Sequence, residues 1–197
     1  MSETIGAQRG AETNPAREWV TYEPENDTHR LQMQKILKSF LSDPSMEPFL
    51  PLSPKVPSAI RRFVDMRSFI KSTDDRTLQA LVLPSADSTK FLGVLFYQFG
   101  SGTMGGGGLY LDPSVRSGTL RALKDLTRIF LKKVDTFNER LSRFDRVSEI
   151  AFLRSSDKQL TNLYKRYGGT DISVEGRTDI VETKISLEAL HRFAEPH

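Results

Sequence analysis

The strongest periodic signal in the 197-residue chain is a long amphipathic helix between Val115 and Phe144. Side chains suited to a core recur there at spacings of three and four, which is the period of one face of an α-helix. These residues are Leu120, Leu123, Thr127, Phe130, Val134, Phe137, Leu141 and Phe144. Strand-like segments lie on both sides of this helix, so its apolar face belongs to the core of a domain that also contains a sheet.

The flanking segments follow a definite order of strands and helices. Two apolar runs separated by a turn-forming stretch, 77–83 and 90–99, predict adjacent antiparallel strands. The predicted strands are 18–23, 77–83, 90–99, 109–111, 147–153, 170–174 and 180–185. The predicted helices run from Asn26 or Asp27 to Ser42, and over 58–72, 115–144 and 156–167. Three strands in a row, then strands alternating with helices, then a closing hairpin predict an α/β fold with a central mixed sheet and helices on both faces.

Composition excludes several kinds of site and sets the expected compartment. The chain has no cysteine, which rules out disulfides, thiolate zinc sites and a cysteine nucleophile. Its three histidines are scattered, which argues against a metal site and against a Ser-His-Asp triad. No apolar run approaches the roughly 20 residues of a membrane span, and no secretory signal is evident. We therefore expect a cytoplasmic protein without a metal, with residues 17–193 as one domain after a flexible arm of residues 1–16.

Two segments resemble motifs of the GNAT acyltransferases. The segment Leu111–Gly118 (LDPSVRSG) resembles the strand-to-helix turn of that family, usually V-x-P-x-x-R-G-x-G-x-G. The segment Asp157–Gly168 resembles its N-x-x-A-x-x-x-Y-x-x-x-G helix, with Asp157 in place of the asparagine. Both occur in the family's order, separated by one strand. The resemblance spans roughly residues 17–187 and implies a GNAT-like acyl-CoA N-acyltransferase fold.

The resemblance also implies a site for acetyl-CoA. In the family, acyl-CoA lies where two neighbouring parallel strands splay apart, and its pyrophosphate lies on the N-terminus of the next helix. The positions that this implies for cofactor binding are Leu109, Leu111, Arg116, Ser117, Gly118, Thr119 and Arg121. Thr119 and Arg121 stand where the family has small residues. Either the loop binds CoA in a shifted way, or it has lost CoA.

Tyr164 is the catalytic residue that the resemblance implies. In many GNAT enzymes the tyrosine at this position is a general acid that protonates the departing CoA thiolate. The plainer interpretation of Tyr164 is a half-buried helix residue. Asp112 and Glu149 are possible helpers in removing the proton of the acceptor amine, although a solvated or helix-capping carboxylate is the alternative for both.

Two further patterns each have competing interpretations. Gly100–Gly105 spells G-x-G-x-x-G, but a Rossmann turn opens directly into a helix, whereas further glycines and a strand follow here. We therefore interpret Gly100–Gly108 as a flexible hairpin connection. A basic stripe, defined as Arg121, Lys124, Arg128 and Lys132, is either the solvated face of the long helix or a contact for phosphates, acidic protein or RNA. Without interleaved aromatic residues, it lacks the features of a nucleic-acid stacking platform.

The resemblance thus implies an acyl-CoA-dependent N-acyltransferase in which an amine of a small molecule or protein attacks the thioester directly. The alternative is a catalytically inactive GNAT-fold protein that binds an assembly partner through residues 1–16. The altered glycine loop and the Lys/Arg-rich helix 117–143 are similar to those of acetyltransferase-like morphogenesis proteins of short-tailed phages. That similarity implies a virion-associated protein of the host cytoplasm or the virion.

Overall fold

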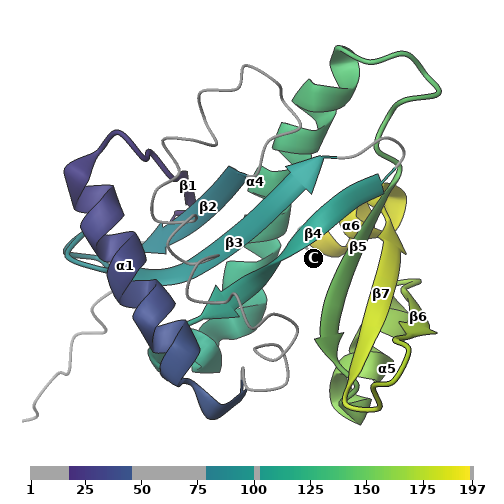
Figure 1. Ribbon diagram of the computed structural model, residues 1–197. Coiled ribbons are helices and arrows are strands. Elements are labelled where there is room, and N and C mark those ends of the chain that lie inside the picture. The colour runs from purple at the N-terminus through teal and green to yellow at the C-terminus, as the bar shows by residue number, and fades with distance from the viewer. Residues whose placement is uncertain (1–17, 46–78, 100–102, 196–197) are drawn as a thin grey trace, which may run out of the picture.

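The computed structural model describes residues 18–45, 79–99 and 103–195, and these residues form one mixed sheet with helices on both faces (Figure 1). The seven strands of this part of the chain follow the order β1-β2-β3-β4-β5-β7-β6. They are β1 (Val20–Thr21), β2 (Gln79–Pro84), β3 (Phe91–Phe99), β4 (Thr103–Leu111), β5 (Glu149–Ser155), β6 (Thr170–Ser173) and β7 (Ile180–Ser186). The helical elements are α1 (Asp27–Ser42), the 3-10 helix η2 (Pro113–Gly118), α4 (Thr119–Glu139), α5 (Lys158–Arg166) and α6 (Leu187–Ala194). The predicted α/β class is confirmed, whereas the predicted helix 58–72 and arm 1–16 lie outside the described residues.

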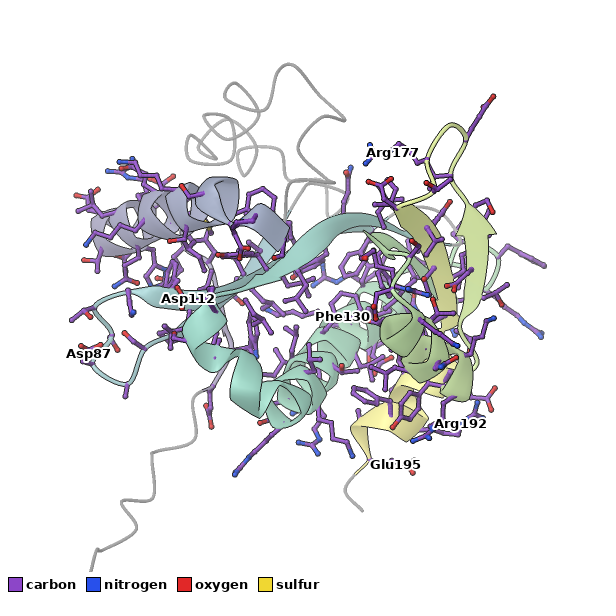
Figure 2. All side chains as sticks on the ribbon, turned by 90° about the horizontal axis from the view of Figure 1, so that it is seen from below. Asp87, Asp112, Phe130, Arg177, Arg192 and Glu195 are labelled. Carbon is purple, nitrogen blue, oxygen red and sulfur yellow. The ribbon has the colours of Figure 1, made fainter. Side chains whose placement is uncertain are left out.

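One face of the sheet is covered by α1 (Figures 1 and 2). Asn26 caps this helix, because its side-chain oxygen accepts the backbone N–H groups of Thr28 and His29 at 3.0 and 3.2 Å. The buried residues of this face are Tyr22, Met33, Ile36, Leu37, Ala80, Val82, Phe91, Val94 and Tyr110. The predicted start of the helix at this point is confirmed. No helix among the described residues is both long and apolar enough to cross a bilayer.

The opposite face carries α4, α5 and α6 and the larger apolar core (Figure 2). The ring of Phe130 on α4 meets Tyr97 of β3 edge to face, with 5.4 Å between ring centroids. Trp19, just before the short β1, ties the sheet to the same helix, since its Nε1 donates to the carbonyl of Ala122 at 3.2 Å. The sheet is therefore joined to α4 by both apolar packing and a polar contact from the far end of the chain.

α4 is shorter than the predicted helix 115–144 at both ends. At its start, Pro113–Gly118 forms a 3-10 helix instead. In its last turn, Asn138 binds Val147 twice: its Oδ1 accepts the Val147 N–H at 2.8 Å and its Nδ2 donates to the Val147 carbonyl at 2.9 Å. This clamp turns the chain back toward the sheet, so Phe144, which periodicity assigned to the core, is 93% exposed.

The glycine-rich segment before Leu109 is part of a strand, so its prediction as a flexible connection is wrong from Thr103 onward. β4 begins at Thr103, and its glycines pair in antiparallel register with β3. The register passes from Gly106–Tyr97 to Gly108–Phe96, which leaves Gly107 as the extra residue of a β-bulge. Glycine is depleted in strands because it has no side chain to pack, yet β3 supplies the backbone partner that holds this segment extended.

The C-terminal elements differ from the prediction by one helix. α5 ends at Arg166, and the chain leaves the helix at Gly168 as expected, with φ of +78° there. The Gly169 N–H donates to the Tyr164 carbonyl at 2.8 Å and the Gly168 N–H to the Lys165 carbonyl at 3.0 Å, which is a Schellman motif. After β7, the unpredicted α6 is capped by Ser186, whose hydroxyl oxygen accepts the Ala189 N–H at 3.2 Å.

Candidate functional site

β4 and β5 are the parallel pair of the described sheet, and they part early. They share three residue pairs, which are Thr103–Glu149, Met104–Ile150 and Gly105–Ala151. Beyond these pairs β4 continues along β3, and β5 continues along β7. The two ribbons move apart toward their carboxyl ends in Figure 1. Open α/β sheets bind ligands outside the carboxyl ends of their parallel strands, which makes this end of the sheet the candidate site.

The segment that follows β4 is fixed by Asp112. Its Oδ1 accepts the backbone N–H and the hydroxyl of Ser114 at 2.9 and 2.6 Å, and its carbonyl accepts the Val115 N–H at 3.0 Å. These contacts start η2, so Asp112 has the helix-capping role that was the alternative to assisting the acceptor amine. The carboxylate therefore sets the path of the chain from β4 into α4.

The positions that resemblance implied for CoA lie in consecutive elements at this end of the sheet. Leu109 and Leu111 are on β4, where it runs away from β5, and Leu109 is 37% exposed. Arg116, Ser117 and Gly118 belong to η2, and Thr119 begins α4. Arg121, in the first turn of α4, is exposed. The structure describes no side chains for residues 116–120.

Tyr164 comes to the same region from a different element. Its ring, on α5, meets the ring of Phe152 edge to face with 5.2 Å between centroids. Phe152 is the first residue of β5 beyond the last pair with β4. Tyr164 therefore lies beside the point where the two strands part. Burial raises the pKa of the Tyr164 hydroxyl above 10.0, and the positive charge of Arg154 acts in the opposite direction.

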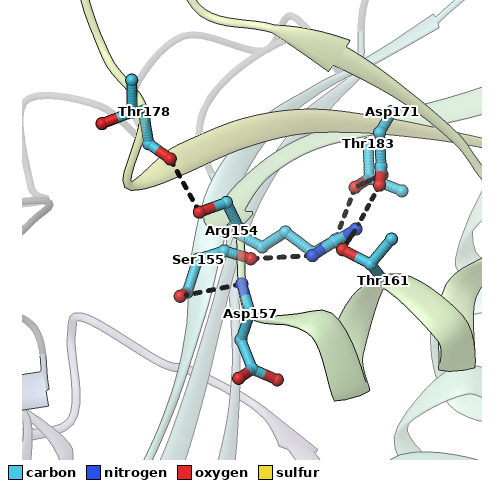
Figure 3. A network of polar contacts seen from close by, with 8 residues as sticks. Arg154, Ser155, Asp157, Thr161, Asp171, Thr178 and Thr183 are labelled. Carbon is cyan, nitrogen blue, oxygen red and sulfur yellow. Dashed lines mark hydrogen bonds and ion pairs between the residues drawn. The ribbon is translucent and has the colours of Figure 1, made fainter.

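A buried polar network beside Tyr164 was not predicted. Arg154, only 5% exposed, donates from Nη2 to Oδ2 of Asp171 at 2.6 Å and from Nε to Oγ1 of Thr183 at 2.7 Å (Figure 3). Burial alone would raise the pKa of Asp171, but hydrogen bonds from Thr183 and Arg154 outweigh burial and hold that pKa below 3.8. One feature of the sequence could have indicated that Arg154 is buried. Arg154 follows Ile150 and Phe152 at intervals of two residues, so its side chain lies on the same apolar face of β5.

Two other carboxylates do not join this site. Glu149 lies in the paired part of β5, with its Oε1 3.9 Å from the Nζ of Lys184. Successive side chains of a strand point to opposite faces, so Glu149 and Phe152, three residues apart, lie on different faces of the sheet. Glu149 thus lies on the face of the sheet opposite Tyr164, and its help in removing the proton of the acceptor amine stays a prediction. The Asp157 carbonyl accepts the Thr161 N–H at 2.9 Å, so Asp157 is the N-cap residue immediately before α5.

Half of the basic stripe holds α6. Arg128 donates from Nε to the Ala194 carbonyl at 2.8 Å, and Lys124 donates from Nζ to the Glu195 carbonyl at 3.3 Å. These carbonyls are at the C-terminal end of α6, where cations are stabilised by the helix dipole. Arg121 and Lys132 are exposed. The stripe is therefore neither a purely solvated face nor a surface left wholly to a ligand.

Solved structures share this architecture, although neither a family model nor a curated protein matches the sequence. A Desulfovibrio desulfuricans protein described as an acetyltransferase of the GNAT family has a TM-score of 0.57 and 14% identity, over 87% of this chain and 99% of that chain. The PaiA N-acetyltransferase of Thermoplasma acidophilum, solved with coenzyme A, has a TM-score of 0.56 and 12% identity, over 86% and 98%. A GNAT acetyltransferase of Staphylococcus aureus has a TM-score of 0.55 and 12% identity, over 87% and 99%. The chain therefore has the fold of the GNAT acetyltransferases.

Proposed function

We propose that this protein is an acyl-CoA-dependent N-acyltransferase. The observation that carries the proposal is the end of β4–β5 pairing at Gly105–Ala151, with Tyr164 packed on the next residue of β5. A sheet gains nothing in its own stability by giving up pairing between two neighbouring strands. A ligand that lies between the two strands and binds their backbone groups would replace the lost pairing.

The residues present suit acyl-CoA on two counts. The pantetheine arm would lie along β4 at Leu109 and Leu111, where the strand has left β5. The pyrophosphate would lie beside Arg116, Ser117 and Gly118, at the amino end of the η2–α4 segment, where a helix dipole favours anions. An exposed Arg121 is compatible with phosphate, because its side chain can reach an anion in solvent.

When bound, acyl-CoA would supply the thioester carbonyl carbon that the amine attacks. A carbon–nitrogen bond would form as the nitrogen loses one proton to solvent, the carbon–sulfur bond would break, and the sulfur would leave with the bonding electron pair. Tyr164 donates its hydroxyl proton to that sulfur and is reprotonated from solvent. A tyrosine hydroxyl is protonated at neutral pH, which is the state that a general acid requires, and burial raises the pKa of the Tyr164 hydroxyl further.

Ligand-induced stabilisation tests the proposal. Acetyl-CoA at about 100 times its dissociation constant should stabilise the fold by about 2.7 kcal/mol. For a domain of this size that corresponds to a rise in melting temperature of about 5–11 °C. No rise at millimolar acetyl-CoA would refute the proposed cofactor.

A pair of variants locates the site. Leu109→Trp adds bulk to β4 where it leaves β5, and should raise the dissociation constant for CoA at least about tenfold. Ile172→Trp is the matched control, because Ile172 is similarly exposed, at 41% against 37%, but lies on the edge strand β6. Equal CoA affinities of the two variants would place the cofactor elsewhere.

A catalytically inactive partner-binding protein is the second candidate. Thr119 and Arg121, at positions where the family has small residues, favour this function over catalysis. It predicts no heat of CoA binding in calorimetry, and partner capture that weakens when residues 1–16 are removed. A measurable CoA affinity together with amine acetylation that Tyr164→Phe abolishes would eliminate this candidate.

A further inference from the structure

Arg154 is held in one orientation by hydrogen bonds to four residues (Figure 3). Besides Asp171 and Thr183, its guanidinium donates from Nη1 to the Ser155 carbonyl at 2.7 Å and from Nη2 to Oγ1 of Thr161 at 3.1 Å. Asp171 is itself fixed, since Thr183 donates its hydroxyl to Oδ1 of Asp171 at 2.7 Å. A planar guanidinium with every nitrogen engaged has little freedom to move.

The fixed guanidinium faces the ring of Tyr164. The Cζ atom of Arg154 lies 5.3 Å from the ring centroid, within the range of a cation–π contact. Phe152, two residues earlier on the same face of β5, meets the ring edge to face. Two residues of one strand thus hold the phenol against the part of β5 that no longer pairs with β4.

The charge that contacts the phenol ring comes from β5. Arg154 on β5 contacts the ring directly, and Asp171 on β6 is bound to the same guanidinium. Lys165 is the next residue on α5 and is exposed. A cation beside a phenol favours the phenolate that remains after proton donation, whereas burial disfavours it. Arg154 is the neighbour that opposes burial at Tyr164.

We propose that Arg154 is a positioning residue for Tyr164: its guanidinium holds the phenol ring beside Phe152 and stabilises the phenolate formed when the hydroxyl gives up its proton. The orienting and electrostatic effect belongs to the free protein, and its use in catalysis rests on the proposed acyltransferase function. The proton leaves Tyr164 for the departing sulfur and returns from solvent, while Arg154 stays charged throughout.

The test is the titration of the Tyr164 phenol in the free protein, followed by NMR of tyrosine labelled at Cζ and assigned with Tyr164→Phe. Arg154→Met with Asp171→Asn removes the cation without leaving a buried carboxylate unpaired, and should move the titration midpoint upward. Asp171→Asn alone leaves the cation with less counter-charge, and should move the midpoint downward. Lys165→Met is the matched control, because it removes a neighbouring exposed cation, and should leave the midpoint near that of the wild type.

Opposite shifts in the two Arg154–Asp171 variants would support the proposal. An unmoved midpoint in either folded variant would overturn it, so the single Asp171→Asn variant decides the matter if the double variant does not fold. If the protein acetylates amines, the double variant should also lower kcat about tenfold or more while leaving CoA affinity unchanged. Shifts of the titration midpoint in a protein that transfers no acetyl group would support the role of Arg154 and refute the proposed function. Acetyl transfer with an unmoved midpoint would support the proposed function and refute the role of Arg154.

Discussion

Gly93 of β3 lies beneath the side chains of Trp19 and Leu111, and its replacement by alanine tests how tightly they pack on the sheet. A Cβ at Gly93 would be 2.8 Å from Cη2 of Trp19, 2.8 Å from Cδ2 of Leu111 and 3.4 Å from Cβ of Leu83. Carbon atoms pack best at about 3.5–4.0 Å, so two of these contacts are severe clashes. The Leu111 methyl group can rotate away. The Trp19 ring cannot easily move, because it is 3% exposed and its Nε1 is bound to the Ala122 carbonyl.

We expect Gly93→Ala to lower the free energy of unfolding by about 2 kcal/mol, within the range for overpacked cores. That loss corresponds to a fall of about 4–8 °C in melting temperature. Urea unfolding followed by circular dichroism measures it. Trp19→Phe removes Cη2 and so relieves one clash, at the cost of the indole hydrogen bond. The double variant should therefore lose less free energy of unfolding than the two single variants lose together, by at least about 0.5 kcal/mol. A loss below about 0.5 kcal/mol for Gly93→Ala, or strict additivity, would refute the reasoning.

Three further changes probe the elements around the candidate site. Asp171→Asn should cost about 3 kcal/mol near neutral pH by leaving Arg154 without its charge partner. The pKa of Asp171 is lowered below 3.8 in the folded protein, so the extra stability of the wild type over this variant is present above about pH 4. That extra stability shrinks as the pH falls through the pKa of Asp171 in the folded protein. A difference in the free energy of unfolding that stays constant from about pH 7 to about pH 2 would contradict this. Gly168→Ala should cost about 1 kcal/mol in thermal unfolding because φ there is +78°, and no measurable loss would exclude the left-handed cap. Arg128→Ala should cost about 1 kcal/mol by removing a donor to the end of α6, whereas Lys132→Ala on the same stripe should change stability by less than about 0.5 kcal/mol.

Much of the fold could be predicted from local patterns in the sequence. Six of the described strands and three of the described helices fall on predicted segments, because apolar period and turn residues act over a few neighbours. α6 was missed because it is only eight residues long and follows β7 without a turn. The strand character of Thr103–Gly108 was missed for a different reason. It comes from pairing with β3, and a partner strand is invisible in a local window.

The candidate site was predictable only in part, and the division has a physical cause. The motif around Tyr164 is contiguous in sequence, so it could be read directly. The network that surrounds Tyr164 combines Arg154, Asp171 and Thr183 from three different strands. Each of these residues is ordinary in isolation, and an arginine near a strand end predicts exposure rather than burial. Only the register of β5, β6 and β7 brings them together.

The early parting of β4 and β5 raises the question of what joins the two halves of the sheet. The three residue pairs between β4 and β5 are a short connection between the half of the sheet formed by β1–β4 and the half formed by β5, β7 and β6. The contacts of α6 supply a second connection. Ala189 of α6 lies in the same apolar core as Phe130 of α4, and the cations of Arg128 and Lys124 bind the carbonyls at the end of α6. Because α6 follows β7 directly, and β7 pairs with β5 along its length, whatever fixes α6 to α4 also fixes β5. The helix layer on one face thus allows the strands to part at their carboxyl ends without detaching half of the sheet.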